Sequence, residues 1–257
     1  MIHTFLVSTC YTCLYIGSLY IFAVGRPKPG LVRNNPNVVL ARCIGVIIAS
    51  FLSCFFTNWL CNINPLVSFD FKQTVKCLLH VGILFLGPLY QTIFIDKLYK
   101  DCIEYLFFEI RNLATWRNLV IGPLSEEVMF RCAMIPLFER ANYSRKETIL
   151  SAPFLFGFAH FHHSYELLLS YPGAYVIAMV QFLVQFFYTT LFGWYSTYVF
   201  LQTHSLWPTF LIHSFCNFMG LPVFYGRIGT TFQTTIYYTL LITGLFLFVI
   251  TWNMFYS

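Results

Sequence analysis

Charge is what this chain lacks most. Its 257 residues include only ten acids and fifteen Lys and Arg, so that 10% are charged, whereas 58% are hydrophobic and 20% aromatic. Soluble domains carry about 25% charged residues. Apolar runs of about 20 residues recur along the chain, and each is long enough to cross a bilayer core of roughly 30 Å. The composition therefore excludes an ordinary soluble protein and predicts an integral membrane protein.

Other signals are also missing. We find no internal repeat, no low-complexity segment and no break in composition, which predicts a single transmembrane domain over residues 1–257. The pair Cys10-x-x-Cys13 has no second pair at metal spacing, so the nine cysteines are expected to be mostly apolar buried thiols. The basic residues are spread over loops and not gathered in one patch, which argues against a nucleic-acid partner.

The apolar runs predict an all-α fold: a polytopic membrane protein of about eight transmembrane helices enclosing a membrane-embedded polar cavity. A less apolar stretch, residues 96–117, predicts an amphipathic helix at the membrane interface. The expected spans are approximately 5–25, 38–60, 75–95, 118–138, 147–163, 174–200, 205–225 and 232–255.

Loop charges predict the orientation. The first loop carries Arg26, Lys28, Arg33 and Arg42 without an acid, and the N-terminal tail has no Lys or Arg. The positive-inside rule places this loop in the cytosol. The loop with Arg140, Arg145 and Lys146 argues against this orientation, because it would then face the lumen.

Two adjacent carboxylates interrupt the span 118–138. Glu126 and Glu127 are followed by Arg131, and ionisable residues inside a span are expensive enough to indicate function. Residues four apart share a helix face, so Glu127 can pair with Arg131. Glu126 is turned about 100° away and keeps its carboxylate free to act as a general base. A purely structural ion pair would explain Glu127 and Arg131 but not Glu126.

Two further polar motifs follow. His160 ends the run Phe156-Gly-Phe-Ala-His160, where Gly157 and Ala159 leave room for a close approach, and His162 and His163 are expected at the interface. His213 and Asn217 are four apart and project from one helix face. Alone, this last pair could equally be a hydrogen bond between packed helices. With the predicted orientation, all three motifs fall in the cytosolic half of the membrane.

A carboxylate, a histidine and a His/Asn donor pair suit the hydrolysis of an amide. Glu126 with His160 could hold and deprotonate water, while His213 and Asn217 could stabilise the oxyanion. A zinc protease using Glu126, His160 and His213 is one alternative, although no H-E-x-x-H motif is present and Asn is a poor zinc ligand. An inert scaffold or a transporter are others, but a transporter should show broken helices in matched halves.

These three motifs, in this order and spacing, resemble the CAAX protease and bacteriocin-processing superfamily. The run from Gly157 to His163 is particularly similar to its eukaryotic branch, the type II CAAX prenyl proteases. The resemblance covers residues 118–220 by motif, which marks that stretch as the catalytic core, and the remainder by the number of spans.

The resemblance implies a membrane-embedded endopeptidase of the endoplasmic reticulum with its active site facing the cytosol. Its partners would be prenylated C-terminal CAAX proteins, Ras-type GTPases among them, together with membrane lipid, and it would remove their last three residues. The catalytic roles of the family carry over to Glu126, His160, His213 and Asn217, with Glu127 and Arg131 as supporting residues. We expect no cofactor and no metal.

Overall fold

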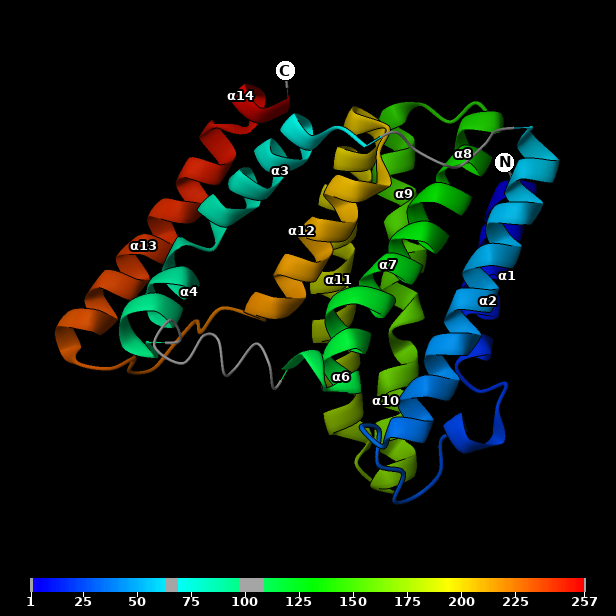
Figure 1. Cartoon of the computed structure of the whole chain (residues 1–257), viewed down its shortest axis with the longest axis horizontal. Coiled ribbons are helices and arrows are strands. Elements are labelled where there is room, and N and C mark those ends of the chain that lie inside the picture. Colours follow the sequence, from blue (N-terminus) through cyan, green and yellow to red (C-terminus); the bar gives the residue numbers. More distant parts are fainter. Residues whose placement is uncertain (1, 63–68, 98–108, 257) are drawn as a thin grey trace.

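The computed structural model describes residues 2–62, 69–97 and 109–256, and all of the regular structure in these ranges is helical. The all-α prediction is therefore confirmed (Figure 1). The α-helices are α1 (Ile2–Ser18), α2 (Pro36–Cys61), α3 (Phe71–Leu84), α4 (Leu86–Tyr90), α6 (Leu113–Trp116), α7 (Gly122–Glu127), α8 (Ile135–Arg140), α9 (Arg145–Ala159), α10 (Phe161–Ser170), α11 (Tyr175–Thr203), α12 (Leu206–Met219), α13 (Thr231–Ile250) and α14 (Trp252–Tyr256). A 3₁₀ turn, η1 (Ala23–Gly25), and three π-helical turns, η2 (Gln91–Ile95), η4 (Arg117–Ile121) and η5 (Val128–Ala133), connect them.

Fewer helices meet the length of a membrane span than the apolar runs predict. In the part of the chain that the structure describes, α2, α11 and α13 are long and apolar enough, and α3 with α4 and η2 makes a fourth if a bent pair counts as one span. The other predicted spans are shorter or broken. The segment 118–138 is divided among η4, α7, η5 and α8, and the segment 147–163 breaks at His160, between α9 and α10. The breaks fall where the polar motifs lie.

Half of the predicted interfacial helix, residues 98–108, lies outside the described residues. Of its remainder, α6 is helical and is capped by Asn112, whose side chain accepts a hydrogen bond from the amide of Ala114. The cap satisfies one of the amide groups that a helix start leaves without a partner.

Close backbone contacts hold the bent pair against α13. The axis turns by 83° between α3 and α4. A Cβ on Gly244 of α13 would lie 2.5 Å from the carbonyl oxygen of Ile83, and one on Gly87 of α4 would lie 3.0 Å from that of Tyr237. A side chain at Gly244 would therefore require the backbone to shift, and one at Gly87 would be crowded; small residues at such contacts are common where helices pack inside a membrane. As a result α3 and α4 pack along α13, and these helices lie together on the left in Figure 1.

Glycine also brings α9 against α11. A Cβ on Gly157 would lie 2.3 Å from the Thr190 hydroxyl oxygen, and one on Gly193 would lie 2.8 Å from Cβ of Pro153. The close approach expected at Gly157 is therefore made by α11. This contact fixes the helix that ends at His160 beside the helix that supplies the next wall of the site.

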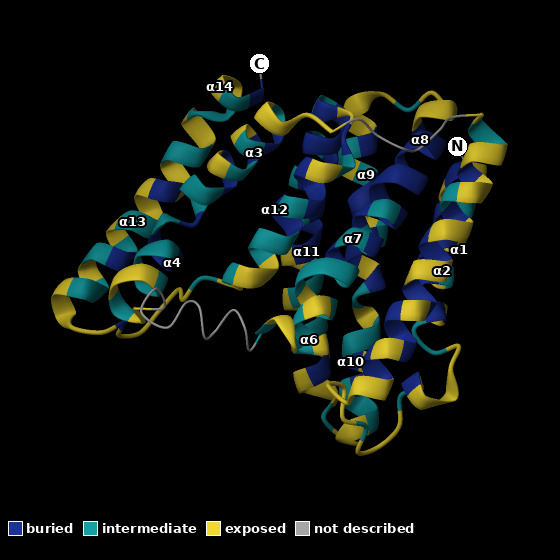
Figure 2. Cartoon of the chain, in the orientation of Figure 1, coloured by how far each residue is buried: buried dark blue, intermediate teal, exposed yellow. Residues whose placement is uncertain are grey.

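The burial pattern separates a central core from an apolar outer surface (Figure 2). Met129, Ile135 and Phe138 are fully buried in η5 and α8, whereas α13 buries only Tyr237 and Gly244. Large apolar side chains are exposed along α2, α11 and α13, as expected for surfaces that face lipid rather than water. Cys10 and Cys13 are exposed as well, so the expectation that this pair is buried is wrong, because both lie on the outer face of α1.

The two basic segments lie at opposite ends of the bundle. In Figure 1 the first loop lies at the bottom, and the turn between α8 and α9, which carries Arg140 and Arg145, lies at the top. Arg42 is not part of that loop: it is a buried residue of α2 whose guanidinium reaches back to the carbonyl oxygen of Gly25.

Candidate active site

Glu127 is the centre of a buried polar network. Its side chain is fully buried, and its Oε2 lies 3.2 Å from Nε of Arg131, which is the predicted ion pair. The Ser196 hydroxyl of α11 donates to the same oxygen at 2.7 Å, and Nδ1 of His213 donates to Oε1 at 2.8 Å. A carboxylate buried with three such partners is satisfied, since each one offsets part of the cost of burial.

Glu126 is the opposite case, although it is the next residue of the same helix. Its side chain keeps 20% of its surface accessible, and its nearest charged partner is His213, with Nε2 3.7 Å from Oε2. That distance is too long for a good hydrogen bond. The carboxylate lines a cavity of about 1150 Å³. The consecutive glutamates are thus divided between the protein interior and the cavity, as their rotation about the helix predicts.

His213, on α12, lies between the two carboxylates. Its Nδ1 donates to Glu127, and this orientation of the ring turns Nε2 toward Glu126 and the cavity. The ring also packs against Phe192 of α11, with centroids 4.7 Å apart. A carboxylate behind one imidazole nitrogen fixes both the tautomer and the orientation of the ring.

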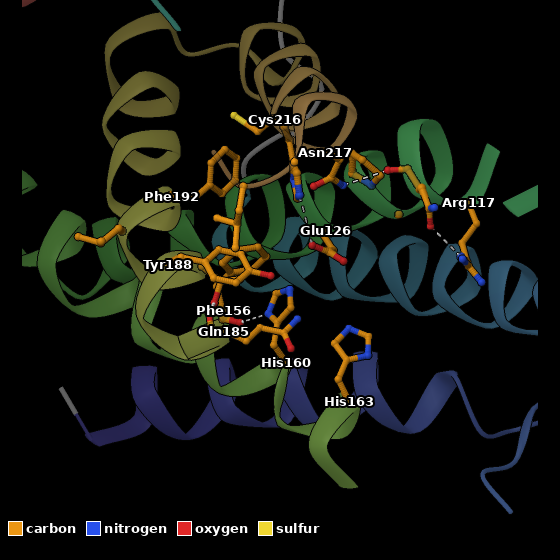
Figure 3. A pocket seen from close by; sticks show the side chains of 18 of the residues that line it. Arg117, Glu126, Phe156, His160, His163, Gln185, Tyr188, Phe192, Cys216 and Asn217 are labelled. Atoms are coloured by element: carbon orange, nitrogen blue, oxygen red, sulfur yellow. Dashed lines mark hydrogen bonds and ion pairs between the residues drawn. The ribbon is translucent and has the colours of Figure 1, made fainter. Parts of the chain in front are cut away.

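His160 is oriented by the backbone. Its Nδ1 donates to the carbonyl oxygen of Phe156 at 2.8 Å, so Nε2 remains free to accept a hydrogen bond. The residue lies between α9 and α10, as the C-cap of the first and the N-cap of the second, and its ring lines the cavity at this break. Figure 3 shows His160 and Glu126 directed toward the same space from different helices.

Phe156 connects the parts of the site. Its ring is 4.8 Å from that of His160 and 6.1 Å from that of His213, and the guanidinium of Arg131 lies over it at 4.6 Å. The sequence shows the residue as part of a motif but does not show that its ring would pack between both histidines and the arginine. This packing supports the two imidazoles in addition to the hydrogen bonds on their Nδ1 atoms.

Asn217 also lines the cavity, one turn after His213. Its side-chain amide donates to the carbonyl oxygen of Asn118 at 3.0 Å, which joins α12 to the π-helical turn η4. An amide nitrogen carries two hydrogens, so a second donor remains for a ligand. All four predicted catalytic residues, Glu126, His160, His213 and Asn217, therefore line one cavity (Figure 3).

The sequence reasoning missed two parts of the site. Ser196 completes the network of Glu127, and a small polar residue within the apolar helix α11 was the available signal. Glu166, which the sequence patterns do not single out, is a buried residue of α10 paired with Arg33 and Arg42. His162 and His163 line the cavity beside it, and His163 accepts a hydrogen bond from Arg33 at 3.0 Å.

The grouping of possible metal ligands is relevant to the alternative of a zinc protease. Within residues 2–62, 69–97 and 109–256, no three His, Cys, Asp or Glu side chains are grouped closely enough to hold a metal ion together. Glu127 is already paired with Arg131 and with Nδ1 of His213. Metal independence stays a prediction, and a chelation experiment tests it below.

Comparison with known proteins agrees with the site. Residues 110–219, which include all of these motifs, match the family described as Type II CAAX prenyl endopeptidase Rce1-like. The chain is 50% identical to the probable CAAX prenyl protease 2 of Schizosaccharomyces pombe over 97% of its length and 93% of that protein. It is 33% identical to the human CAAX prenyl protease 2 over 82% of its length and 68% of that protein, and 27% identical to the Saccharomyces cerevisiae protein over 84% and 80%.

No solved structure matches the chain. The relatives, however, are similar along nearly the whole chain, and the matched segment contains the cavity residues of α7, α9 and α12. Taken together with the all-helical membrane fold, they establish that the chain belongs to the type II CAAX prenyl endopeptidase family.

Proposed function

We propose that this membrane endopeptidase removes the C-terminal -aaX tripeptide from prenylated CAAX proteins, using water that Glu126 and His160 activate. The observation that carries the mechanism is the contrast between two neighbours. Glu127 is engaged by Arg131, Ser196 and His213, whereas the Glu126 carboxylate faces the cavity without a close partner. A base must be free to accept a proton, so Glu126 is the better candidate.

Water would be held between Glu126 and His160. His160 offers Nε2 as an acceptor, because its Nδ1 donates to the Phe156 carbonyl. Glu126 takes one proton from the water while the water oxygen attacks the carbonyl carbon of the prenylated cysteine. The same proton then passes from Glu126 to the amine of the departing tripeptide as the C–N bond breaks. The first products are the carboxylic acid of the prenylcysteine and a tripeptide with a free amine. The acid then gives its proton to that amine, leaving a carboxylate and an ammonium group, so atoms and charge balance without a covalent enzyme intermediate.

The oxyanion of the tetrahedral intermediate would be stabilised from α12. His213 presents Nε2 to the cavity, and in its protonated form this nitrogen donates a hydrogen bond. Asn217 retains a second amide hydrogen beyond the one given to Asn118. Donors that are already fixed cost no reorganisation when charge develops, and removing one typically costs about 10²–10³ in rate.

The cavity suits a substrate whose lipid stays in the membrane. Its walls include apolar residues of α11 and α13, such as Leu191, Phe248 and Val249, and its other end reaches Arg33 of the first loop. Each CH₂ of the prenyl chain that stays in hydrocarbon contributes about 0.8 kcal/mol to its membrane binding. A cavity open sideways to lipid would let the prenyl chain remain in the bilayer during cleavage. We place the first-loop side in the cytosol and the enzyme in the endoplasmic reticulum, where Ras-type GTPases would be among its substrates.

The test is a cleavage assay with purified protein in detergent. A farnesylated CAAX peptide is incubated with and without a chelator, and the products are identified by mass spectrometry. We expect a single cut after the farnesylated cysteine, releasing the intact tripeptide under both conditions. Cleavage at another bond, or none by folded protein, would contradict the proposed function.

A further inference from the structure

Three arginines gather where the cavity meets the first loop. Arg33, Arg42 and Arg117 all line it, together with Asn34, Asn118 and His163. Glu166 is the carboxylate that pairs with two of them, Arg33 and Arg42, in the described part of the chain. Within the described residues, the two carboxylates of α7 do not pair with these arginines: Glu127 is engaged by Arg131 and His213, and the nearest charged partner of Glu126 is His213 at 3.7 Å. The mouth of the cavity therefore carries more positive than negative charge.

The three arginines differ in how they are satisfied. Arg42 is buried, and its guanidinium is engaged within the protein: it pairs with Glu166 at 2.8 Å and donates two hydrogen bonds to the carbonyl oxygen of Gly25. Arg33 shares the same carboxylate at 3.3 Å, but its side chain is 48% exposed. This arrangement uses both oxygens of Glu166 and leaves part of the Arg33 guanidinium open to the cavity.

Arg117 has no carboxylate at all among its described partners. Its guanidinium donates to the carbonyl oxygen of Arg33 at 3.2 Å, to Oδ1 of Asn34 at 3.1 Å and to Oδ1 of Asn118 at 3.0 Å. These acceptors are neutral, so they fix its position without compensating its charge. Figure 3 shows Arg117 on the same side of the cavity as Asn217 and Glu126. A cation held in this way is ready for an anionic ligand.

We propose that Arg117, assisted by Arg33, binds the free C-terminal carboxylate of the substrate. The inference rests on the proposed function, because cleavage of a tripeptide leaves that carboxylate three residues beyond the scissile bond. A planar guanidinium is the side chain best suited to bind a carboxylate through two hydrogen bonds. The same residues would not be needed to hold the prenyl group or to activate water.

The spacing fits. Arg117 and Glu126 are nine positions apart on the consecutive turns η4 and α7, which is at most roughly 14 Å along the axis at the α-helical rise of 1.5 Å per residue. An extended tripeptide spans about 10 Å at 3.3–3.6 Å per residue, and the long arginine side chain can cover the remainder. Asn217 connects the two ends, since it lines the cavity and donates to the residue after Arg117. A cation at this fixed distance would select tails of three residues.

The experiment compares two substrates that differ only at the C-terminus. A farnesylated CAAX peptide with a free carboxylate and the same peptide with a C-terminal amide are cleaved by the wild-type protein in neutral phosphatidylcholine vesicles. We expect the amide to lower kcat/KM by about ten- to hundredfold, because a hydrogen-bonded charge is lost. The change should appear mainly in KM, since the carboxylate is bound in the ground state and the transition state alike.

Variants assign the effect to the site. Arg117→Gln should lower kcat/KM for the free acid to the level of the amide and leave the amide unchanged, and Arg33→Gln should do so more weakly. Arg140→Gln removes an exposed arginine at the opposite end of the bundle and is the matched control, expected to change neither substrate. The wild-type comparison requires no variant to fold.

Two results would overturn the inference while leaving the proposed function intact. One is equal cleavage of acid and amide by the wild type. The other is an Arg117→Gln variant whose cleavage of the acid and of the amide falls by the same factor. If that equal fall occurs only in vesicles containing anionic lipid, the arginines bind a lipid headgroup and not the substrate carboxylate. If the wild type cuts neither peptide, the proposed function itself fails.

Discussion

The two faces of α7 place the same chemical group in opposite environments. On one face Glu127 is fully buried and held by Arg131, Ser196 and His213, and on the other Glu126 faces the cavity with its nearest charged partner 3.7 Å away. The first arrangement resembles a structural ion pair, and the second resembles a general base. One helical step of about 100° is therefore enough to separate a fully engaged carboxylate from one that faces the cavity.

Replacing Glu126 should give the largest loss of activity. Glu126→Gln keeps the size of the side chain but cannot accept a proton, so cleavage should fall by about 10²–10⁴-fold, the usual contribution of a general base. The fold should be retained, because no buried cation depends on this carboxylate. The measurement is the cleavage rate per folded molecule, with folding followed by the melting temperature in detergent. Wild-type cleavage by this variant would reverse the assignment of the two glutamates.

Replacing Glu127 should instead reduce stability. Glu127→Gln leaves the fully buried Arg131 without its partner, and breaking a buried pair costs about 3–5 kcal/mol. We expect a clearly lower melting temperature than for Glu126→Gln. The double variant Glu127→Gln/Arg131→Met, which removes both charges, is the control and should recover part of the loss. If the single variant is as stable as wild type, the network is not structural.

Ser196→Ala should give a smaller effect of the same kind. The hydroxyl donates to the Glu127 carboxylate, and hydrogen bonds to charged groups contribute about 1.5–3 kcal/mol. Thr189→Ala, on the same helix, is the matched control, because its hydroxyl bonds only to carbonyls of its own helix and should matter little. Chemical denaturation compares the two variants. Equal stability of both would show that Ser196 adds nothing to the network.

Chelation should have no effect. The residues grouped around Glu126 offer hydrogen-bond donors and one free carboxylate, and this set suits water activation better than zinc. Activity measured after prolonged treatment with a strong chelator, with metal content determined in parallel, is expected to equal that of untreated protein. Stoichiometric zinc, with activity lost on its removal and restored on its return, would sink this expectation.

Sequence patterns predict the helical fold and the residues of the cavity, because both depend on the local spacing of residues. Residues four apart share a face, which is how the contact of Glu127 with Arg131 could be predicted. The breaks in the helices could not be predicted from local spacing, because the π-helical turns and the bend after α3 depend on how segments far apart in the chain pack. For the same reason, the contact between His213 and Glu127 was not predicted: it joins residues 86 positions apart.

The central claim is that Glu126 and His160 hold the water that attacks the substrate. The most direct measurement is an experimental structure with an uncleavable analogue bound, in which the scissile amide is replaced by a ketomethylene group. We predict a water within about 3.2 Å of both Glu126 and Nε2 of His160, with the analogue's carbonyl oxygen facing His213 and Asn217. A substrate carbonyl bound away from α12, or Glu126 and His160 directed at separate places with no shared water, would contradict the account.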